Sequence, residues 1–388
     1  MLWRRAMELA EGLPTPFFLF DLDRVRAQYE KLYEALGSAG IHYAVKANNH
    51  AAVLASLAAT GCGFEVASIF EANLLSDLGV DPSRLIFSAP IKLASHIRDA
   101  FRLGIKRYVF DCRSELEKIA ALAPGSELLI RLAVGNEGSR FPLSMKFGAE
   151  LNGSVALAQE ASRAGLRIAG VAFHVGSQCE REETWVEAME KAGRLWRLLE
   201  ERGAEPYCLD IGGGFPIEYD RPVPSLESIG SKLLEAAESL FPEGIELIAE
   251  PGRCVTGEAG VLVTSVIGRA KRDGTEWLYV DASALHGLME SLQAGGSFPY
   301  PLRTLVDTAE RMTCVLAGPT CDPDDTNMRD AELPLLEVGD LVCILNSGAY
   351  SFVYSTSFHG YPAPAVHFID RGGEVLWLAG TAGMALTA

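Results

Sequence analysis

The 388-residue sequence contains no apolar run long enough to cross a membrane. Its first residues, MLWRRAMELAEG, lack the apolar core and the small-residue cleavage site of a secretory signal peptide. We therefore expect a cytoplasmic protein with no membrane association.

The sequence also lacks paired cysteines. No CxxC pair occurs among its eight cysteines, which are scattered at positions 62, 112, 179, 208, 254, 314, 321 and 343. This scatter does not fit zinc-finger spacing, and a chain with 48% apolar residues can build a core without a disulfide framework. We expect reduced thiols, most of them buried as small apolar side chains, and no metal site.

Positive charge is scarce as well. The chain has 34 Lys and Arg against 51 Asp and Glu, a formal net charge of −17. This balance argues against nucleic acid as a partner and weakly favours cationic ligands.

A regular alternation of short apolar runs and longer amphipathic stretches extends from about residue 43 to residue 254. Between the runs, segments such as AAVLASLAATG and SELEKIAALAP have apolar residues three and four apart, as helices do, and several end in glycine. Eight strands, each followed by a helix, predict an α/β fold with a closed TIM-type (β/α)8 barrel; an open doubly wound sheet is the alternative. The expected strands are YAVKA (43–47), FEVAS (64–68), RLIFS (84–88), RYVFD (107–111), LLIRLAV (128–134), IAGVAFHVG (168–176), YCLDIGG (207–213) and IELIAE (245–250).

After Arg253 the pattern changes to strand-like segments without intervening helices. They are AGVLVTSVIGRA, EWLYVDA, TCVLAG, LVCILNSGAY and AVHFIDRGGEVLWLAG, the last a hairpin around residues 370–373. FFLFDL near the N-terminus is also strand-like and fits the same unit. We predict a barrel over residues 23–254 and a C-terminal β-rich domain formed by residues 1–22 and 255–388.

Unusual polar residues stand at the ends of the predicted barrel strands, where barrel enzymes carry their function. Lys46 ends the first strand in YAVKAN. It can be a desolvated amine that forms an imine with a cofactor aldehyde, or a strand-end lysine that extends to solvent. His174 ends the sixth strand in FHVGSQ, and a structural, hydrogen-bonded histidine is the simpler interpretation of that residue alone.

Two further groups follow the last predicted barrel strands. The three glycines of LDIGGGFP, residues 212–214, let backbone N–H groups approach an anion, although a tight loop would use the same residues. Glu250 and Arg253 end the eighth strand in AEPGRC. A carboxylate in a barrel mouth needs a cationic partner such as a protonated pyridine nitrogen, whereas a Glu–Arg pair on the surface would contribute little.

The sequence resembles the alanine-racemase-fold (fold type III) decarboxylases, which use pyridoxal phosphate (PLP) and include ornithine/lysine, arginine and diaminopimelate decarboxylases. The resemblance runs from residue 17 to residue 362, nearly the whole chain, and implies a PLP-dependent amino-acid decarboxylase with PLP as its cofactor. The matching motifs, in family order, are FFLFDL, YAVKAN, GFEVAS, LSMKFGA, FHVGSQ, LDIGGGFP, AEPGR, GPTCD and SGAYSFVYSTSFHGYP.

The resemblance implies roles for individual residues. Lys46 would carry PLP through an imine, His174 would stack on its ring, and Glu250 would bind the pyridine nitrogen. Glu65 stands where the family often has an acidic residue near the lysine, a looser match. The phosphate would be held by Ser177, Gly213, Gly214, Arg253 and Tyr350.

Cys321 and Asp322, in GPTCDPDD, match a segment that reaches across a head-to-tail dimer into the neighbouring active site. The resemblance therefore implies a homodimer with shared sites. Cys321 would be the acid that reprotonates Cα. Asp322, with Asp324 and Asp325 nearby, would bind the distal ammonium of a diamino-acid substrate, and Tyr350 would also contact the substrate.

The substrate remains open. Diaminopimelate decarboxylases usually have Glu after the active-site cysteine and an arginine in the segment after the VDAG-like strand, whereas here Asp322 follows and YVDASALHGLMESLQ contains no arginine. These features favour an ornithine- or lysine-type substrate, converted to an amine and CO2 in polyamine biosynthesis. Asp281 matches the substrate-contacting aspartate of ornithine enzymes only with a one-residue shift. A citryl- or acyl-substituted diamino acid of siderophore or other secondary metabolism, and diaminopimelate, are the alternatives.

Two other classes share the fold. Racemases set an arginine against the pyridine nitrogen, where this sequence has Glu250. Related PLP-binding proteins without enzymatic activity lack the β-rich domain, and decarboxylase homologues that became regulators typically lose catalytic residues. Here the β-rich segments are present, and Lys46, Glu250, Cys321 and Asp322 are all retained.

Overall fold

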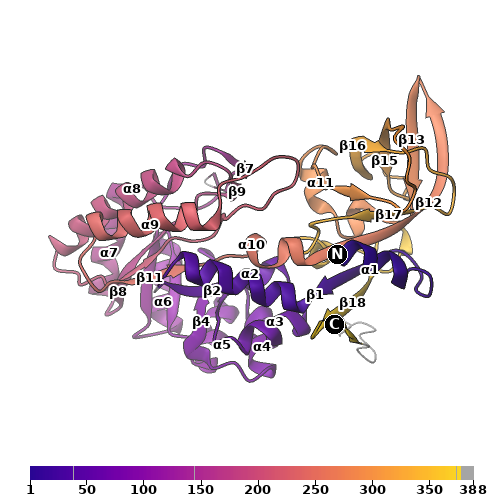
Figure 1. Cartoon of the computed structure of the whole chain (residues 1–388). Helices are drawn as coiled ribbons and strands as arrows, with labels where there is room; N and C mark the ends of the chain where they lie inside the picture. The colour runs from indigo at the N-terminus through magenta and orange to yellow at the C-terminus, as the bar shows by residue number, and fades with distance from the viewer. Residues whose placement is uncertain (38, 144, 373, 377–388) are drawn as a thin grey trace. The chain divides into compact units, whose positions relative to one another are not determined.

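The computed structural model describes residues 1–37, 39–143, 145–372 and 374–376 and divides the chain into two compact units (Figure 1). One unit consists of residues 26–255; the other combines residues 1–25 with the chain from residue 256 onward. Within the described residues, no helix is both long and apolar enough to span a membrane.

Eight parallel strands of the first unit form a closed barrel in the order β10-β11-β2-β3-β4-β5-β6-β8. Closure confirms the (β/α)8 prediction and excludes the open doubly wound sheet. All eight expected strands are present: β2 (Gly40–Ala44), β3 (Gly63–Val66), β4 (Leu85–Phe87), β5 (Arg107–Phe110), β6 (Glu127–Arg131), β8 (Arg167–Ala172), β10 (Cys208–Asp210) and β11 (Glu246–Ala249).

The barrel core is apolar because its strands bury nearly every side chain. One interior cluster brings together residues from six of the strands: Ile86, Val109, Leu129, Ala169, Ala172, Cys208 and Ile248. Gly170 of β8 lies so close to β10 that a Cβ on it would be 1.7 Å from the Cys208 carbonyl oxygen. All eight cysteines are unpaired and six are buried, as expected for reduced thiols used as small apolar residues.

The helices depart from the expected pattern at one place. The eighth strand is followed only by the four-residue α10 (Arg253–Thr256), so the ring is completed by α2 (Leu22–Ala35), which precedes the first barrel strand. Contacts fix α2 beside α9 and α3: a Cβ on Gly230 would meet the Ala35 carbonyl oxygen at 2.1 Å, and Arg26 donates to the Ser56 hydroxyl at 2.7 Å. The other helices are α3 (Ala51–Ala58), α4 (Ile69–Asp77), α5 (Ala94–Leu103), α6 (Arg113–Leu122), α7 (Leu151–Arg163), α8 (Glu183–Glu200) and α9 (Leu226–Leu240).

The second unit is a nine-stranded, mostly antiparallel sheet. FFLFDL joins it as predicted, because β1 (Phe17–Asp21) lies between β12 and β18. The expected C-terminal hairpin is also present, with Asp370 opposite Glu374, while Gly373 and residues 377–388 lie outside the described residues. The remaining strands are β12 (Gly260–Arg272), β13 (Thr275–Val280), β14 (Leu302–Arg303), β15 (Met312–Ala317), β16 (Thr326–Leu333), β17 (Leu341–Ile344), β18 (Ala365–Asp370) and β19 (Glu374–Leu376).

Several elements were not anticipated. Strand β16 (TNMRDAEL) contains no run of apolar residues, so the sequence pattern did not indicate a strand. Its pairing with β15 nevertheless buries Met328, Ala331 and Leu333. A two-stranded sheet of β7 (Ser139–Phe141) and β9 (Ser177–Cys179) is added to the barrel unit. Two helices of the second unit, α1 (Leu2–Leu9) and α11 (Met289–Gln293), were also missed.

Candidate active site

A cavity of about 490 Å3 opens at the carboxyl ends of the barrel strands. It is lined by polar side chains from six strand ends that are far apart in the sequence. These side chains belong to Lys46, Glu65, Ser88, Arg131, His174 and Glu250. In a (β/α)8 barrel this is the end that carries active sites. Lys46, Glu65, His174 and Glu250, predicted from the sequence, are therefore gathered in one cavity, together with two residues that were not predicted.

Lys46 lies in a 3-10 turn (Val45–Ala47) and not at the strand end itself, because β2 stops at Ala44. Its ammonium group donates to the Glu65 carboxylate of the neighbouring strand β3. The Glu65 side chain is 2% exposed while that of Lys46 is 43% exposed. The lysine therefore reaches from the protein wall into the cavity, with its charge balanced by a buried acid.

Glu250 follows β11 and is only 5% exposed. Its carboxylate accepts a hydrogen bond from the Ser88 hydroxyl, which follows β4. Burial, followed by the negative charges of Asp210 and Glu65, raises the pKa of Glu250 well above its ordinary value. Arg253 is also buried, at 3% exposed, so these two residues are not the weak surface pair that the sequence left open.

His174 lies two residues beyond the end of β8, in the loop that lines the cavity, and not within the strand as expected. Its Nδ1 accepts from the backbone N–H of Gly176 at 2.9 Å. Burial, with Arg131 and Lys46 nearby, lowers the pKa of His174 well below its usual value, so the imidazole is neutral at pH 7. A neutral ring with one nitrogen already bonded has a fixed orientation at the cavity wall.

The glycine loop after β10 requires glycine at each of its three positions because backbone segments approach it closely. Added Cβ atoms would lie 2.3 Å from the Phe173 carbonyl oxygen at Gly212, 2.6 Å from that of Glu250 at Gly213, and 2.5 Å from that of Gly176 at Gly214. Gly212 and Gly214 also have positive φ values of 66° and 104°. The loop is therefore packed tightly between the β8 loop and the Glu250 backbone.

Arg253 connects this region to two hydroxyl groups. Its two terminal nitrogens donate to the Tyr219 hydroxyl and the Ser177 hydroxyl, each at 2.9 Å. A buried guanidinium that donates to these neutral hydroxyl oxygens is chemically suited to an anion. Ser177 and Arg253 were predicted; Tyr219 was not, because nothing in its local sequence marks it.

Three unpredicted charged or polar residues complete the barrel site: Ser88, Arg131 and Asp210. Asp210, 1% exposed, accepts from the Gly212 N–H at 2.8 Å through Oδ1, while its Oδ2 is buried without a hydrogen-bond partner. Burial raises the pKa of Asp210 to about 6. Arg131 and Asp210 each end an apolar strand, in LLIRLAV and CLDIGG, so a charged residue that interrupts an apolar run is the signal that could have found them.

The other predicted residues belong to the β-rich unit. Cys321, exposed, and Asp322, half-buried, lie in the turn between β15 and β16. Tyr350 follows β17 in the left-handed conformation, with φ of 53°. Asp281 follows β13 and uses both carboxylate oxygens within its unit, accepting from Thr15 at 2.5 Å and from Thr264 at 2.6 Å.

Asp325 ends this turn. It is 3% exposed, and its carboxylate accepts from Ser283, from the backbone of residue 284 and from Thr320. These bonds tie the 318–325 turn to the loop after β13. Asp325 was expected to add negative charge near Asp322, and the structure shows that its carboxylate is buried and hydrogen-bonded within its own unit.

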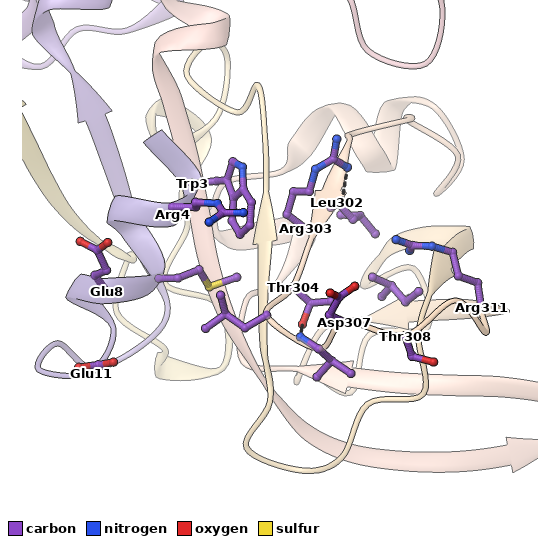
Figure 2. A pocket seen from close by; sticks show the side chains of 14 residues that line it. Trp3, Arg4, Glu8, Glu11, Leu302, Arg303, Thr304, Asp307, Thr308 and Arg311 are labelled. Carbon is purple, nitrogen blue, oxygen red and sulfur yellow. Dashed lines mark hydrogen bonds between the residues drawn. The ribbon is translucent and has the colours of Figure 1, made fainter. Parts of the chain in front are cut away.

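A second cavity, of about 510 Å3, lies within the β-rich unit between helix α1 and the chain around β14 (Figure 2). The residues that line it include Trp3, Arg4, Arg303 and Asp307, which Figure 2 labels. None of the residues predicted from the sequence lines it, so the chemistry points to the barrel cavity and not to this slightly larger one.

Comparisons with known proteins give the family of the chain. Residues 22–257 match the family model for the pyridoxal-dependent decarboxylase pyridoxal-binding domain. A lysine/ornithine decarboxylase from Selenomonas ruminantium is 36% identical over 94% of this chain and 92% of its own length. The crystal structure of lysine/ornithine decarboxylase complexed with cadaverine from Vibrio vulnificus is 34% identical, with a TM-score of 0.86 over 95% of this chain and 98% of that chain. Antizyme inhibitor 2 from Xenopus laevis is 32% identical over 91% of this chain and 80% of its own length.

The residues present fit PLP. Lys46 would supply an amine for the aldehyde, and a cation such as a protonated ring nitrogen would stabilise the charged forms of the buried Glu250 and Asp210 carboxyl groups. Arg253, with its two hydroxyl partners beside the glycine loop, suits a phosphate. Family match, near full-length similarity and site chemistry together show that the chain belongs to the pyridoxal-dependent decarboxylase family and is a PLP-dependent carboxy-lyase.

Proposed function

We propose that this enzyme decarboxylates a basic diamino L-amino acid of the ornithine or lysine type and releases the corresponding amine and CO2. The observation that carries the proposal is the near full-length similarity to lysine/ornithine decarboxylases, over 94% and 95% of this chain. The side chains of the barrel cavity and of the 318–325 turn support it chemically.

Bound PLP supplies an electron sink for the electron pair left behind when the α-carboxylate departs. Lys46 would provide the amine that holds the cofactor until the substrate amine takes its place. Glu250 would keep a proton at the ring nitrogen, and the Ser88 hydroxyl donates to the Glu250 carboxylate and so favours its charged form. His174, neutral and fixed by Gly176, offers a flat ring face to the cofactor.

We assign the phosphate to Ser177, Gly213, Gly214 and Arg253 in the barrel unit. Within the barrel unit the assignment is supported by the buried guanidinium of Arg253, which bonds to Ser177 and Tyr219. The close backbone approach of the glycine loop excludes bulkier residues from the same region.

At the substrate end we propose that the Cys321 thiol gives a proton to Cα and that Asp322 binds the distal ammonium group. Cys321 is exposed and Asp322 half-buried at the tip of the turn, as residues that meet a ligand or a second subunit would be. We propose a homodimer in which this turn completes the site of the partner subunit. Asp281 is not carried into this proposal, because Thr15 and Thr264 already occupy both its oxygens.

The test is a CO2-release assay with purified protein and PLP on a panel of amino acids. The panel contains ornithine, lysine, arginine, meso-diaminopimelate and acylated ornithine and lysine. Turnover of ornithine or lysine with the highest kcat/KM supports the proposal. Preference for an acylated diamino acid or for meso-diaminopimelate would refute the substrate assignment while leaving the decarboxylase chemistry in place.

A further inference from the structure

Gln178 is an unusual residue for its position in the barrel unit. It lies in β9 directly after Ser177, is completely buried, and has φ of 54°, in the left-handed region that glycine favours. A non-glycine residue held there is strained unless surrounding contacts compensate. The neighbouring contacts show what holds it.

The Gln178 side chain makes a reciprocal pair of hydrogen bonds with the backbone of Ile217. Its Nε2 donates to the Ile217 carbonyl at 2.7 Å, and its Oε1 accepts from the Ile217 N–H at 3.1 Å. The amide therefore acts as a strand neighbour would, satisfying both polar groups of a buried backbone residue 39 positions away. Its neighbour Cys179 donates its backbone N–H to the Gly214 carbonyl at 2.9 Å, which places the same tripeptide against the glycine loop.

The segment that Gln178 fixes carries Tyr219, two residues beyond Ile217. The Tyr219 hydroxyl and the Ser177 hydroxyl are the two groups to which the Arg253 guanidinium donates. Gln178 thus connects the residues that carry these two hydroxyl groups. It follows Ser177 directly in the chain, and it is hydrogen-bonded to Ile217, two residues before Tyr219. By holding the backbone at Ile217, the Gln178 side chain determines where Tyr219 lies relative to Arg253.

We infer that Gln178 is a positioning residue for the phosphate of PLP, which acts by holding Tyr219 against Arg253. The inference rests on the proposed phosphate assignment and not on the proposed substrate. It concerns a residue that touches no reacting atom. Groups that orient metal ligands in the same indirect way typically change metal affinity or activity by roughly tenfold or more when removed.

The measurement compares the affinity of the reconstituted protein for PLP with its affinity for pyridoxal, which lacks the phosphate, by quenching of tryptophan fluorescence. Gln178→Leu removes the two hydrogen bonds with Ile217, and a longer one of 3.3 Å from Nε2 to the Glu180 carboxylate, at similar volume. We expect it to weaken PLP binding roughly tenfold and to leave pyridoxal binding unchanged. Equal weakening for both ligands, or no weakening for PLP, would overturn the inference.

A double-mutant cycle with Tyr219→Phe tests the route. If Gln178 acts through Tyr219, the double variant should bind PLP no more weakly than the weaker single variant, whereas multiplied losses would overturn the inference. Arg253→Gln tests the phosphate assignment separately. If Arg253→Gln leaves the ratio of PLP affinity to pyridoxal affinity unchanged, both the phosphate assignment and the inference are wrong. If Arg253→Gln lowers this ratio and Gln178→Leu does not, only the inference is wrong.

Two further variants serve as controls, one for misfolding and one for the neighbouring ion pairs. Gln178→Gly removes the amide while relieving the backbone strain, so it carries the test if Gln178→Leu fails to fold. Glu180→Gln removes the charge that pairs with Arg140 and Arg221. It keeps an oxygen that can accept from the Gln178 amide, as Glu180 does at 3.3 Å. It should leave the PLP-to-pyridoxal ratio unchanged, and a loss equal to that of Gln178→Leu would overturn the assigned route.

Discussion

The Ser88 hydroxyl donates a hydrogen bond to the Glu250 carboxylate across the mouth of the barrel, although the two residues are 162 positions apart. Their strands, β4 and β11, are separated in the barrel by β2 and β3. This bond favours the charged form of a carboxyl group whose pKa is otherwise raised by burial.

Replacing Ser88 should therefore change the pH dependence of the reaction. Without the donor, Ser88→Ala raises the pKa of Glu250 further, so the acid limb of the kcat/KM profile moves to higher pH. At neutral pH we expect kcat/KM to fall about tenfold, since a hydrogen bond to a charged group contributes ~1.5–3 kcal/mol. Ser88→Thr retains the hydroxyl and should behave like the parent. An unshifted acid limb in Ser88→Ala would contradict the role.

Lys46 should be the residue that carries PLP, because it is the lysine that reaches into the barrel cavity beside Glu65. Purified protein is expected to show the visible absorbance of lysine-bound cofactor, and borohydride reduction should attach the cofactor to a peptide containing Lys46. Lys46→Ala should lose both. A borohydride-fixed cofactor in Lys46→Ala would show that another lysine carries it. Lys146, which also lines the cavity, is the matched control.

The shared-site dimer can be tested by complementation. Lys46 belongs to the barrel unit and Cys321 to the β-rich unit. In a dimer with shared sites, Lys46→Ala and Cys321→Ala therefore remove residues that different subunits supply to one site. In a mixed dimer with shared sites, one site contains both intact residues. We expect activity to recover to about a quarter of the parent when the two inactive proteins are mixed in equal amounts, from random pairing. No recovery after demonstrated subunit exchange would exclude shared sites.

Asp322 should contribute the negative charge that binds the distal ammonium. Its Oδ1 accepts from the Asp324 N–H at 2.9 Å, a bond that an asparagine oxygen can also accept. Asp322→Asn therefore removes the charge while preserving the turn, and kcat/KM for the diamino substrate should fall roughly tenfold or more. Asp324→Asn, at an exposed neighbour, should have little effect. Equal effects of the two substitutions would show that only the general charge of the turn matters.

His50 should make the fold sensitive to acid. Its Nδ1 caps α3 by accepting from the Ala52 N–H at 3.2 Å, and burial lowers the pKa of His50 from 6.5 to about 4. The unfolded chain binds the proton more readily, so the stability that depends on neutral His50 is present above pH 6.5 and is lost as the pH falls towards 4. His50→Asn keeps a good cap without the titration.

Urea unfolding at pH 7.5 and pH 5 measures this effect. The parent should lose more stability on acidification than His50→Asn, by at least about 1 kcal/mol. His50→Ala, which lacks a cap, should be destabilised at both pH values by ~1 kcal/mol. Parallel losses in the parent and in His50→Asn would show that other groups account for the acid sensitivity.

The local pattern of the sequence determined the elements that bury apolar faces. All eight barrel strands were recognisable because each is a short apolar run between helical segments, and FFLFDL was assigned to the β-rich unit for the same reason. Lys46, Glu65, His174 and Glu250 were recognisable because each interrupts or ends such a run within a family motif. A polar strand such as β16 escaped because its burial depends on its partner strand.

Only the tertiary structure decided which side chains meet. Nothing near Ser88 in the sequence indicates Glu250, and nothing near Gln178 indicates Ile217, because each pair is joined by barrel closure and loop packing. The same reason applies to Asp325. The sequence does not indicate that its carboxylate accepts hydrogen bonds from Ser283 and Thr320. Periodicity reports which face of an element is buried, whereas hydrogen bonds and pKa values depend on the groups that packing brings within a few ångströms.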